Sequence, residues 1–282
     1  MSMKYGKKKS KTTNYFSHDF IISNHGDIVS IVAMVFVVGL VSRATHPLAA
    51  KFVILQHNTT IESNSSRKLY SFLDDNQFLY YPGPYDSCSV LFYTLMCIVI
   101  HAVIQEYILD KFCKRSSLTR TRLSRFNYSS QLAIFFGTSL YFLFYLIISE
   151  GVITSFSDLW IGYPHVPISF WTKAYFIFQI SYWVHNIPEL YFQKVKREEM
   201  PPRIIQACIY LVAIIASYFL SFIKLSIVIS LFQYIGDFIY YLGHAFHLAN
   251  KENISQVIMK VYDLTFFPIR LIITIISGLI FQ

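Results

Sequence analysis

Titratable and amide side chains lie inside long apolar stretches of this sequence. His185 and Glu189, in YWVHNIPELYF, are four residues apart and therefore share one face of a helix. Such a pair can contribute to a metal site or relay a proton. His244 and His247, three residues apart, offer a similar spacing. The candidate intramembrane polar set comprises His101, Gln105, Glu106, His185, Glu189, Asp237 and His244.

A structural role for this set competes with a chemical one. Glu106, Glu189 and His244 lie near the predicted ends of their apolar stretches, where polar groups reach interfacial water. No compact group of three or four metal ligands stands out along the chain. Side-chain hydrogen bonds between membrane helices contribute about 1 kcal/mol each, which is enough to fix packing. We therefore expect polar contacts around a shallow cavity, with no catalytic residue, cofactor or metal.

The elements that must position these residues are membrane-spanning helices. Of the 282 residues, 54% are hydrophobic and only 14% are charged, whereas about 25% are charged in a typical soluble domain. Apolar runs of about 20 residues, the length that a bilayer requires, recur along the chain. The sequence predicts an all-α, polytopic transmembrane bundle of about seven spans. Their expected ranges are 28–50, 87–109, 131–150, 171–192, 204–223, 225–247 and 262–281.

The positions of Lys and Arg orient this bundle. With the N-terminus in the cytosol, 17 of the 24 basic residues fall in cytosolic segments, as the positive-inside rule requires. The net charge of +8 therefore reflects membrane orientation rather than DNA binding. One cytosolic group could contact the ribosome or lipid headgroups, although solvated orientation charges remain the simpler alternative. That group comprises Lys114, Arg115, Arg120, Arg122 and Arg125.

Glycosylation sequons agree with this orientation. NTT at Asn58 and NSS at Asn64 fall in the predicted non-cytosolic loop 51–86, whereas the sequons at Asn127 and Asn253 fall on the cytosolic side. We expect a multi-pass protein of the endoplasmic reticulum membrane, with Asn58 and Asn64 as glycosylation candidates.

Three stretches carry a family resemblance: SHDFIISNHGDIVS, IHAVIQEYILDK and YWVHNIPELYFQK. Together they resemble the translocating-chain-associating membrane protein (TRAM) family, from about Phe16 to the end of the chain. The resemblance implies an accessory of the Sec translocon that helps ribosome-bound nascent chains to cross or enter the membrane. It also implies contact with membrane phospholipids, and the TLC fold that ceramide synthases share.

The resemblance to ceramide synthases supplies a test for catalysis. Their His-His pair falls here on Gln206 and Ala207, their His-Asp pair on Phe232 and Gln233, and a later Asp on Asp237. Acyl transfer needs a titratable base beside the attacking amine, and these replacements do not supply one. We therefore expect a non-enzyme. The alternative is a lipid-binding or lipid-modifying protein in which His185, Asp237 and His244 replace the missing motif.

The predicted organisation has three parts. Residues 1–27 form a basic cytosolic segment, residues 28–115 hold the first two spans with the lumenal loop 51–86, and residues 116–282 form a TLC-like bundle. Members of the TRAM family continue through another span into a basic tail. On this comparison we expect the last family span and tail to be missing.

Overall fold

The computed structural model describes residues 18–59, 79–113, 118–151, 163–164, 166–193 and 195–278. The N-terminal elements are α1 (His18–Ser23), α2 (His25–Gly39), α3 (His46–Val53), β1 (Asn58–Thr59) and β2 (Leu79–Tyr80). They are followed by α5 (Asp86–Ile104), a π-helical segment (Gln105–Leu109), α6 (Asp110–Cys113), α7 (Arg120–Glu150), α8 (Phe170–Phe192), α9 (Met200–Phe219), α10 (Ile223–Leu248) and α11 (Glu252–Gly278).

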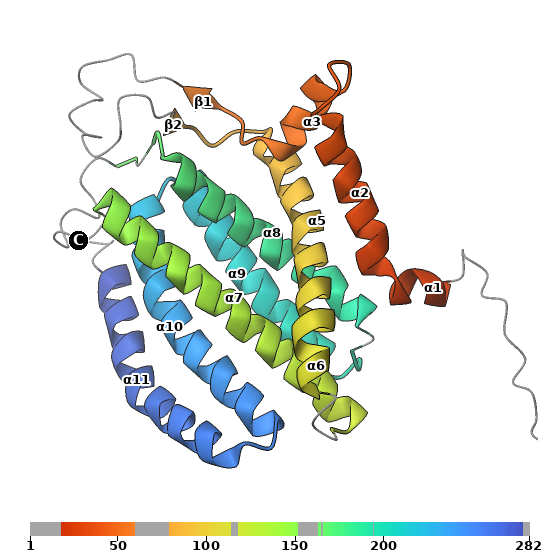
Figure 1. Ribbon diagram of the computed structural model, residues 1–282. Coiled ribbons are helices and arrows are strands. Elements are labelled where there is room, and N and C mark those ends of the chain that lie inside the picture. The colour runs from red at the N-terminus through yellow and green to blue at the C-terminus, as the bar shows by residue number, and fades with distance from the viewer. Residues whose placement is uncertain are drawn as a thin grey trace, which may run out of the picture.

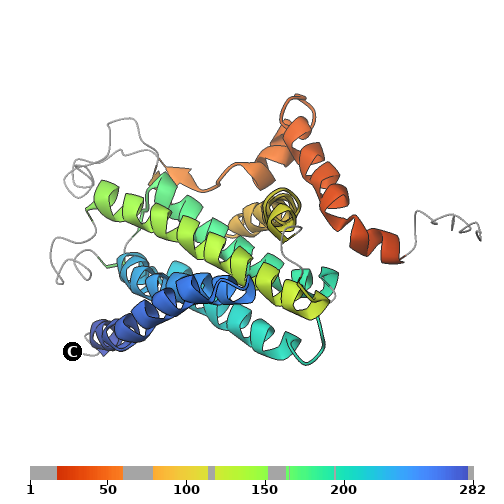
Figure 2. The same ribbon diagram turned by 60° about the horizontal axis from the view of Figure 1, so that its bottom comes forward.

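Helix α8 occupies the centre of the bundle. It packs against α5 on one side and α9 on the other, while α7 packs mainly on α10 and α10 on α11 (Figures 1 and 2). Helix α2 rests on the outer side of α5. Helices α5 and α7 therefore both border α8. Along most of their length, α5 and α7 do not pack extensively against each other.

Aromatic side chains fill the core between these helices. Trp183, Tyr175 and Phe176 of α8, Phe136 of α7 and Tyr234 of α10 are almost completely buried. Trp183 stacks on the ring of Tyr210 with centroids 4.4 Å apart. Large rigid side chains of this kind bury much area with little loss of rotamer entropy, which favours a bundle of one defined packing.

The predicted fold class is confirmed. Within the described residues, five helical stretches are long and apolar enough to cross a membrane. They are Asp86–Leu109, Thr121–Glu150, Met200–Phe219, Ile223–Leu248 and Glu252–Gly278. The 15-residue α2 is shorter than a bilayer requires, and the 23-residue α8 buries many polar side chains.

At three places the helices differ from the predicted span ranges. The expected span 28–50 is interrupted after Gly39 and resumes as the short helix α3 from His46. The third and seventh spans begin earlier than predicted, at Arg120 and Glu252. Polar residues at both places suggested loops, but a helix that projects beyond the hydrocarbon core carries such residues in water. At 31 residues α7 is about 46 Å long, longer than the hydrocarbon core of about 30 Å.

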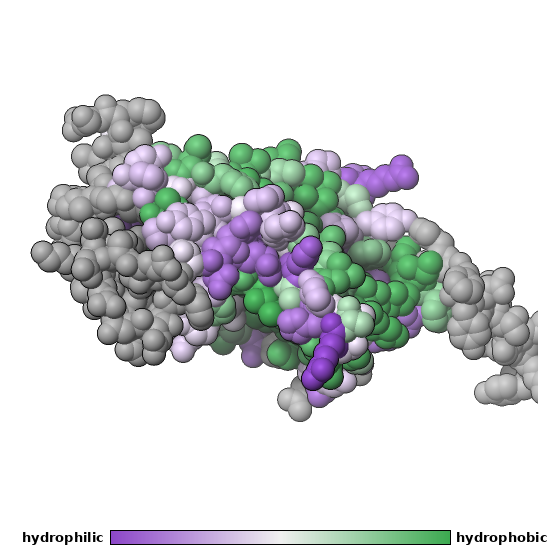
Figure 3. All heavy atoms as spheres, turned by 90° about the horizontal axis from the view of Figure 1, so that it is seen from above, coloured by the Kyte–Doolittle hydropathy of each residue, from purple (hydrophilic) through white to green (hydrophobic). Residues whose placement is uncertain are grey.

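The two ends of the bundle differ. One end, here called the loop end, carries α3, the β1–β2 ribbon and the first residues of α5 and α8. In Figure 3, polar side chains gather at the centre of this end and hydrophobic ones surround them. The opposite end carries α6 and the first residues of α7, α9 and α11. Only three residues separate α9 from α10, so the two helices are joined by a tight turn.

The tight contact of Gly243 with α11 generates a prediction. A Cβ atom at Gly243 would lie 2.9 Å from the Sδ atom of Met259, whereas at Gly236 the nearest atom is 3.8 Å away. We expect Gly243→Val to destabilise the bundle by about 2 kcal/mol through overpacking, and Gly236→Val to cost less. Thermal unfolding in detergent measures both variants, and equal midpoints would contradict this account of the helix contact.

Candidate functional site

Asp86 and Lys173 form an ion pair that is buried at the loop end. The Nζ atom of Lys173 lies 2.7 Å from Oδ1 of Asp86, and the two residues are only 0% and 3% exposed. The same ammonium donates to the carbonyl oxygens of Gln56 at 2.9 Å and Tyr81 at 2.8 Å. Lys173 thereby holds the segments beside both strands against α8.

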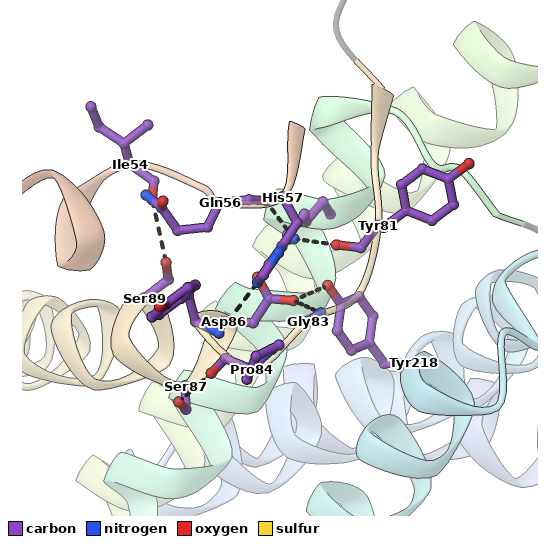
Figure 4. Close-up of polar contacts among 12 residues, drawn as sticks. Ile54, Gln56, His57, Tyr81, Gly83, Pro84, Asp86, Ser87, Ser89 and Tyr218 are labelled. Carbon is purple, nitrogen blue, oxygen red and sulfur yellow. Dashed lines mark hydrogen bonds and ion pairs between the residues drawn. The ribbon is translucent and has the colours of Figure 1, made fainter. Parts of the chain in front are cut away.

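The carboxylate of Asp86 has two further partners. Its Oδ2 atom accepts from the hydroxyl of Tyr218 at 2.7 Å and from the backbone N–H of Gly83 at 2.9 Å (Figure 4). Asp86 is also the first residue of α5, where the helix dipole favours a negative charge. One carboxylate therefore joins α5, α8, α9 and the loop before α5.

Only a glycine fits at position 83, because the ring of His57 lies directly beside its backbone. A Cβ atom at position 83 would lie 2.3 Å from Nε2 of His57, so a side chain there would displace the ring. The His57 ring accepts a hydrogen bond from the backbone N–H of Tyr85 at 3.3 Å and stacks on the Tyr85 side chain. Figure 4 shows His57 beside Gly83. The loop before α5 is thus packed closely around the ion pair.

Glu189 is the centre of a second polar cluster, toward the opposite end of the bundle. Its Oε1 atom lies 3.3 Å from Nε2 of His101 and accepts from the amide of Gln193 at 3.2 Å. Its Oε2 atom lies 3.7 Å from Nε2 of His25. Glu189 is 3% exposed, and its Oε2 atom makes no hydrogen bond among the described residues. The nearby imidazoles of α2 and α5 and the amide of Gln193 therefore compensate only in part for burying a carboxylate.

The remaining contacts extend this cluster. Nε2 of His185 lies 3.5 Å from Nδ1 of His101, and Nδ1 of His185 is 2.5 Å from the carbonyl oxygen of Tyr182. Gln131 of α7 donates to the carbonyl oxygen of His101 at 3.2 Å. The structure therefore brings together His101, His185 and Glu189 from the candidate set.

The other candidates of that set lie elsewhere. Gln105 donates to the carboxylate of Asp110 at 2.8 Å, and Glu106 is exposed. His244 pairs with the hydroxyl of Ser129 at 2.8 Å. Among the described residues, no group of three or more His, Cys, Asp or Glu side chains is arranged to hold a metal ion.

Asp237 belongs to a third network, formed by α9, α10 and α11. Its carboxylate accepts from the hydroxyl of Tyr210 and, at 2.9 Å, from the amide of Gln233. Arg270 donates to the oxygen of Gln233 at 2.8 Å. His185, Asp237 and His244 thus contact different neighbours and do not share a reaction centre.

The positions on which the predicted resemblance places the ceramide synthase motif carry structural contacts. The amide oxygen of Gln206 accepts from the hydroxyls of Tyr241 at 2.9 Å and Tyr128 at 3.3 Å. Ala207 is buried and Phe232 packs against the core. These contacts occupy the amide oxygen of Gln206, and both polar atoms of Gln233 are bonded to neighbouring side chains.

A membrane-facing groove lies between α5 and α7, with α8 at its back. Its volume is about 490 Å³. The buried floor includes the polar side chains of Gln131, Ser139 and Gln179, while Ile100, Thr138 and Tyr141 are exposed along the rim. This groove, hereafter the α5–α7 groove, is lined mostly by apolar side chains and also reaches His101.

The predicted basic contacts begin a helix rather than lie in a loop. Arg122 donates to the carbonyl oxygen of His247 at 2.8 Å, and Arg125 donates to the carboxylate of Glu199 at 2.8 and 2.9 Å. Arg203 binds the same carboxylate at 2.8 Å.

Three predicted residues lie outside the described residues: Lys114, Arg115 and the glycosylation candidate Asn64. Arg120 is the first residue of α7, and Asn58 is exposed in β1.

Several site residues were missed by sequence reasoning. Lys173 was assigned to a span without a partner, although a lysine in an apolar run requires an acceptor, and Asp86 stands at the start of another span. His25 was placed in the segment before the first span, yet it reaches Glu189. Gln193 follows Glu189 by four residues, a spacing that indicates a contact on one helix face.

The buried ion pair predicts a large effect of removing one charge. We expect Lys173→Met to destabilise the protein by about 3 kcal/mol or more, because Asp86 remains buried without its counter-charge. The double variant Lys173→Met/Asp86→Asn should recover part of that loss, and Lys260→Met, on the exposed face of α11, should have little effect. Unfolding midpoints in detergent test this order, which fails if the double variant is the least stable.

The Glu189 cluster predicts a local effect on α2. Substituting Glu189→Leu removes the carboxylate that accepts from Gln193 and lies 3.3 Å from His101 and 3.7 Å from His25, and contacts with a charged group contribute about 2 kcal/mol. We expect amide exchange in α2 to become roughly 30-fold faster, while exchange in α9 changes little. Glu106→Leu, at an exposed position of the adjoining π-helical segment, is the matched control. Unchanged α2 exchange in Glu189→Leu would show that the cluster does not hold this helix.

Comparisons with known proteins agree with this architecture. The family model described as the TLC domain matches residues 125–281. The chain is 36% identical over 247 residues to translocating chain-associated membrane protein 2 from Homo sapiens and, equally, from Mus musculus. In each case the match covers 88% of this chain and 64% of the relative. The predicted family resemblance is therefore confirmed, and the chain belongs to the TLC domain family.

Proposed function

We propose that this protein is a non-enzymatic accessory of the Sec translocon in the endoplasmic reticulum membrane, with its N-terminus in the cytosol. It would assist translocation or membrane insertion of nascent secretory and membrane proteins. The names of its relatives, translocating chain-associated membrane protein 2, support this role. The chain spans 64% of the length of those relatives.

The α5–α7 groove is the observation that carries the proposal. It places the polar side chains of Gln131, Ser139 and Gln179 at the depth of the membrane helices, behind an exposed rim. A nascent segment that carries one or two polar residues enters lipid at a cost of a few kcal/mol. Contact with the rim exposes such a segment to surroundings less apolar than lipid tails, which lowers that cost.

Exposed apolar helices supply the surrounding contact surface. Helix α2 presents Met34, Val35 and Val38 to the membrane, each at least 60% exposed. At the opposite end, Arg122 and Arg125 lie where α7 extends past the hydrocarbon core. In this proposal the basic residues face the cytosol and contact lipid headgroups or the ribosome, and Asn58, with Asn64, faces the lumen as a glycosylation candidate.

The alternative of a lipid-modifying enzyme has less support. It required His185, Asp237 and His244 to converge, but their polar partners are His101, Tyr210 and Ser129, respectively. Gln206 and Gln233 occupy two of the synthase positions and already bind tyrosine or aspartate side chains. General acid–base catalysis would need a titratable group within reach of the substrate, which this pair does not provide.

Photocrosslinking from defined positions of this protein tests the role. A photoreactive residue at Thr138, on the rim, should crosslink to a ribosome-bound nascent chain in microsomes, because a passing segment packs there. The same probe at Val212, which is 66% exposed on α9, is the matched control and should label the chain at least fivefold less.

Two results would contradict the proposal. A Thr138 crosslink that persists after nascent-chain release, or in translocon-depleted membranes, indicates non-specific contact. An absent crosslink in membranes where the protein is folded and resident excludes the rim as the contact surface.

A further inference from the structure

We propose that the α5–α7 groove binds one acyl chain of a membrane phospholipid. The inference concerns the protein before any nascent chain arrives. It depends on the shape and polarity of the groove and not on the translocon role.

The dimensions of the groove favour a single hydrocarbon chain over a helix. Its lining on α5 extends from Tyr93 to Ile104, a length of about 16 Å at 1.5 Å per residue. A volume of about 490 Å³ over that length describes a long and narrow groove. A helix with its side chains is about 10–12 Å wide. Packed carbon chains lie about 4 Å apart, so one chain needs only about 15–20 Å².

The polar groups of the floor make hydrogen bonds within the protein. Gln179 donates to Ser139 at 2.8 Å and accepts from the hydroxyl of Tyr234 at 3.0 Å. Gln131 donates to the carbonyl oxygen of His101, and Thr138 donates to the backbone of its own helix. An apolar chain needs no hydrogen-bond partner, so it can lie over these side chains without breaking their bonds.

The groove is closed at the end farther from the loops. Ile104, its last lining residue on α5, packs against the buried cluster that includes Leu109 and Phe126. The π-helical segment contacts α7 at this level, so the two flanking helices meet below the groove. A chain therefore enters from the membrane or from the loop end and stops at this cluster.

Aromatic side chains mark the entrance nearer the loops. Trp171, Phe142 and Tyr145 contact one another, with ring centroids 5.9–6.2 Å apart. Trp171 and Tyr145 are 48% and 42% exposed. Tryptophan and tyrosine prefer the headgroup level of a bilayer. The headgroup of the bound phospholipid then lies beside these rings and one of its tails extends down the groove.

This site is separate from the positions aligned with the synthase motif. Gln206, Gln233 and Asp237 lie on α9 and α10, whereas the groove is lined by α5, α7 and α8. Helix α5 also precedes the residues that match the TLC domain. The inferred chain site therefore uses a helix from outside that domain.

Lipid retention by the purified protein tests the inference. Full-length protein and the groove variants Thr138→Phe and Ala174→Phe are purified in mild detergent, and bound lipid is measured by native mass spectrometry. We expect the unaltered protein to retain one phospholipid and both variants to retain at least fivefold less, because the new ring fills the groove. Val212→Phe, on the membrane-facing surface of α9, adds the same ring elsewhere and should retain lipid within twofold of the unaltered protein.

Photolabelling of the unaltered protein makes the test independent of variant folding. A phosphatidylcholine with a diazirine near the end of one acyl chain is reconstituted with the protein in vesicles and irradiated. We expect most labelled peptides to contain groove residues of α5, α7 or α8. Three results would overturn the inference. In the photolabelling experiment, it would be labelling of α9 and α11 equal to that of the groove. In the retention experiment, it would be detergent or free fatty acid as the sole bound molecule, or unchanged lipid retention in folded groove variants. None of these readouts involves a ribosome, so the proposed translocon role is tested separately.

Discussion

The buried contact between Lys173 and Asp86 is the constraint on which the loop end depends. An ammonium group that is 0% exposed within an apolar bundle is stable only if its partners are close and well oriented. Here those partners come from the chain before β1, the chain after β2 and the first turn of α5. Asp86 in turn recruits Tyr218 from α9. A single buried pair thus determines how α8, α5 and α9 meet, and breaking it would leave a charge that no neighbour can neutralise.

Glu189 imposes the corresponding constraint nearer the other end, where it holds α2 and α5 on α8. Between these two fixed points α5 follows α8, while α7 follows α10 and approaches α5 mainly near the π-helical segment. The α5–α7 groove is the space that this divergence leaves. Its polar floor is a consequence of the same packing, because Gln179 must pair with Ser139 and Tyr234 inside the bundle. The two polar contacts that fix the helices therefore also create the surface on which both proposals rest.

Much of the architecture could be predicted from sequence because lipid restricts the choices to apolar helices. The tight connection at Leu220–Phe222 and the general positions of the bundle helices followed from hydropathy alone. Hydropathy does not register the break after Gly39 or the early start of α7 at Arg120, because turns and exposed helix extensions depend on neighbours. The contact of His101 with Glu189 needed the crossing of α5 and α8, which spacing along one helix cannot reveal. Lys173 was visible as an unpaired lysine, but its partner was identifiable only in three dimensions.

Two parts of the bundle that hold polar side chains differ in how they are covered. Between α9 and α10, Gln206 and Gln233 bind tyrosine and aspartate side chains, so those polar atoms are already occupied. Between α5 and α7, Gln179 and Gln131 also make hydrogen bonds within the protein, but the groove leaves their mostly apolar surroundings open to an occupant. Since lipid surrounds the rim, an empty groove would leave its apolar lining without partner atoms and lose dispersion contacts. A narrow apolar occupant restores those contacts, and a nascent segment that reaches the rim must then compete with it.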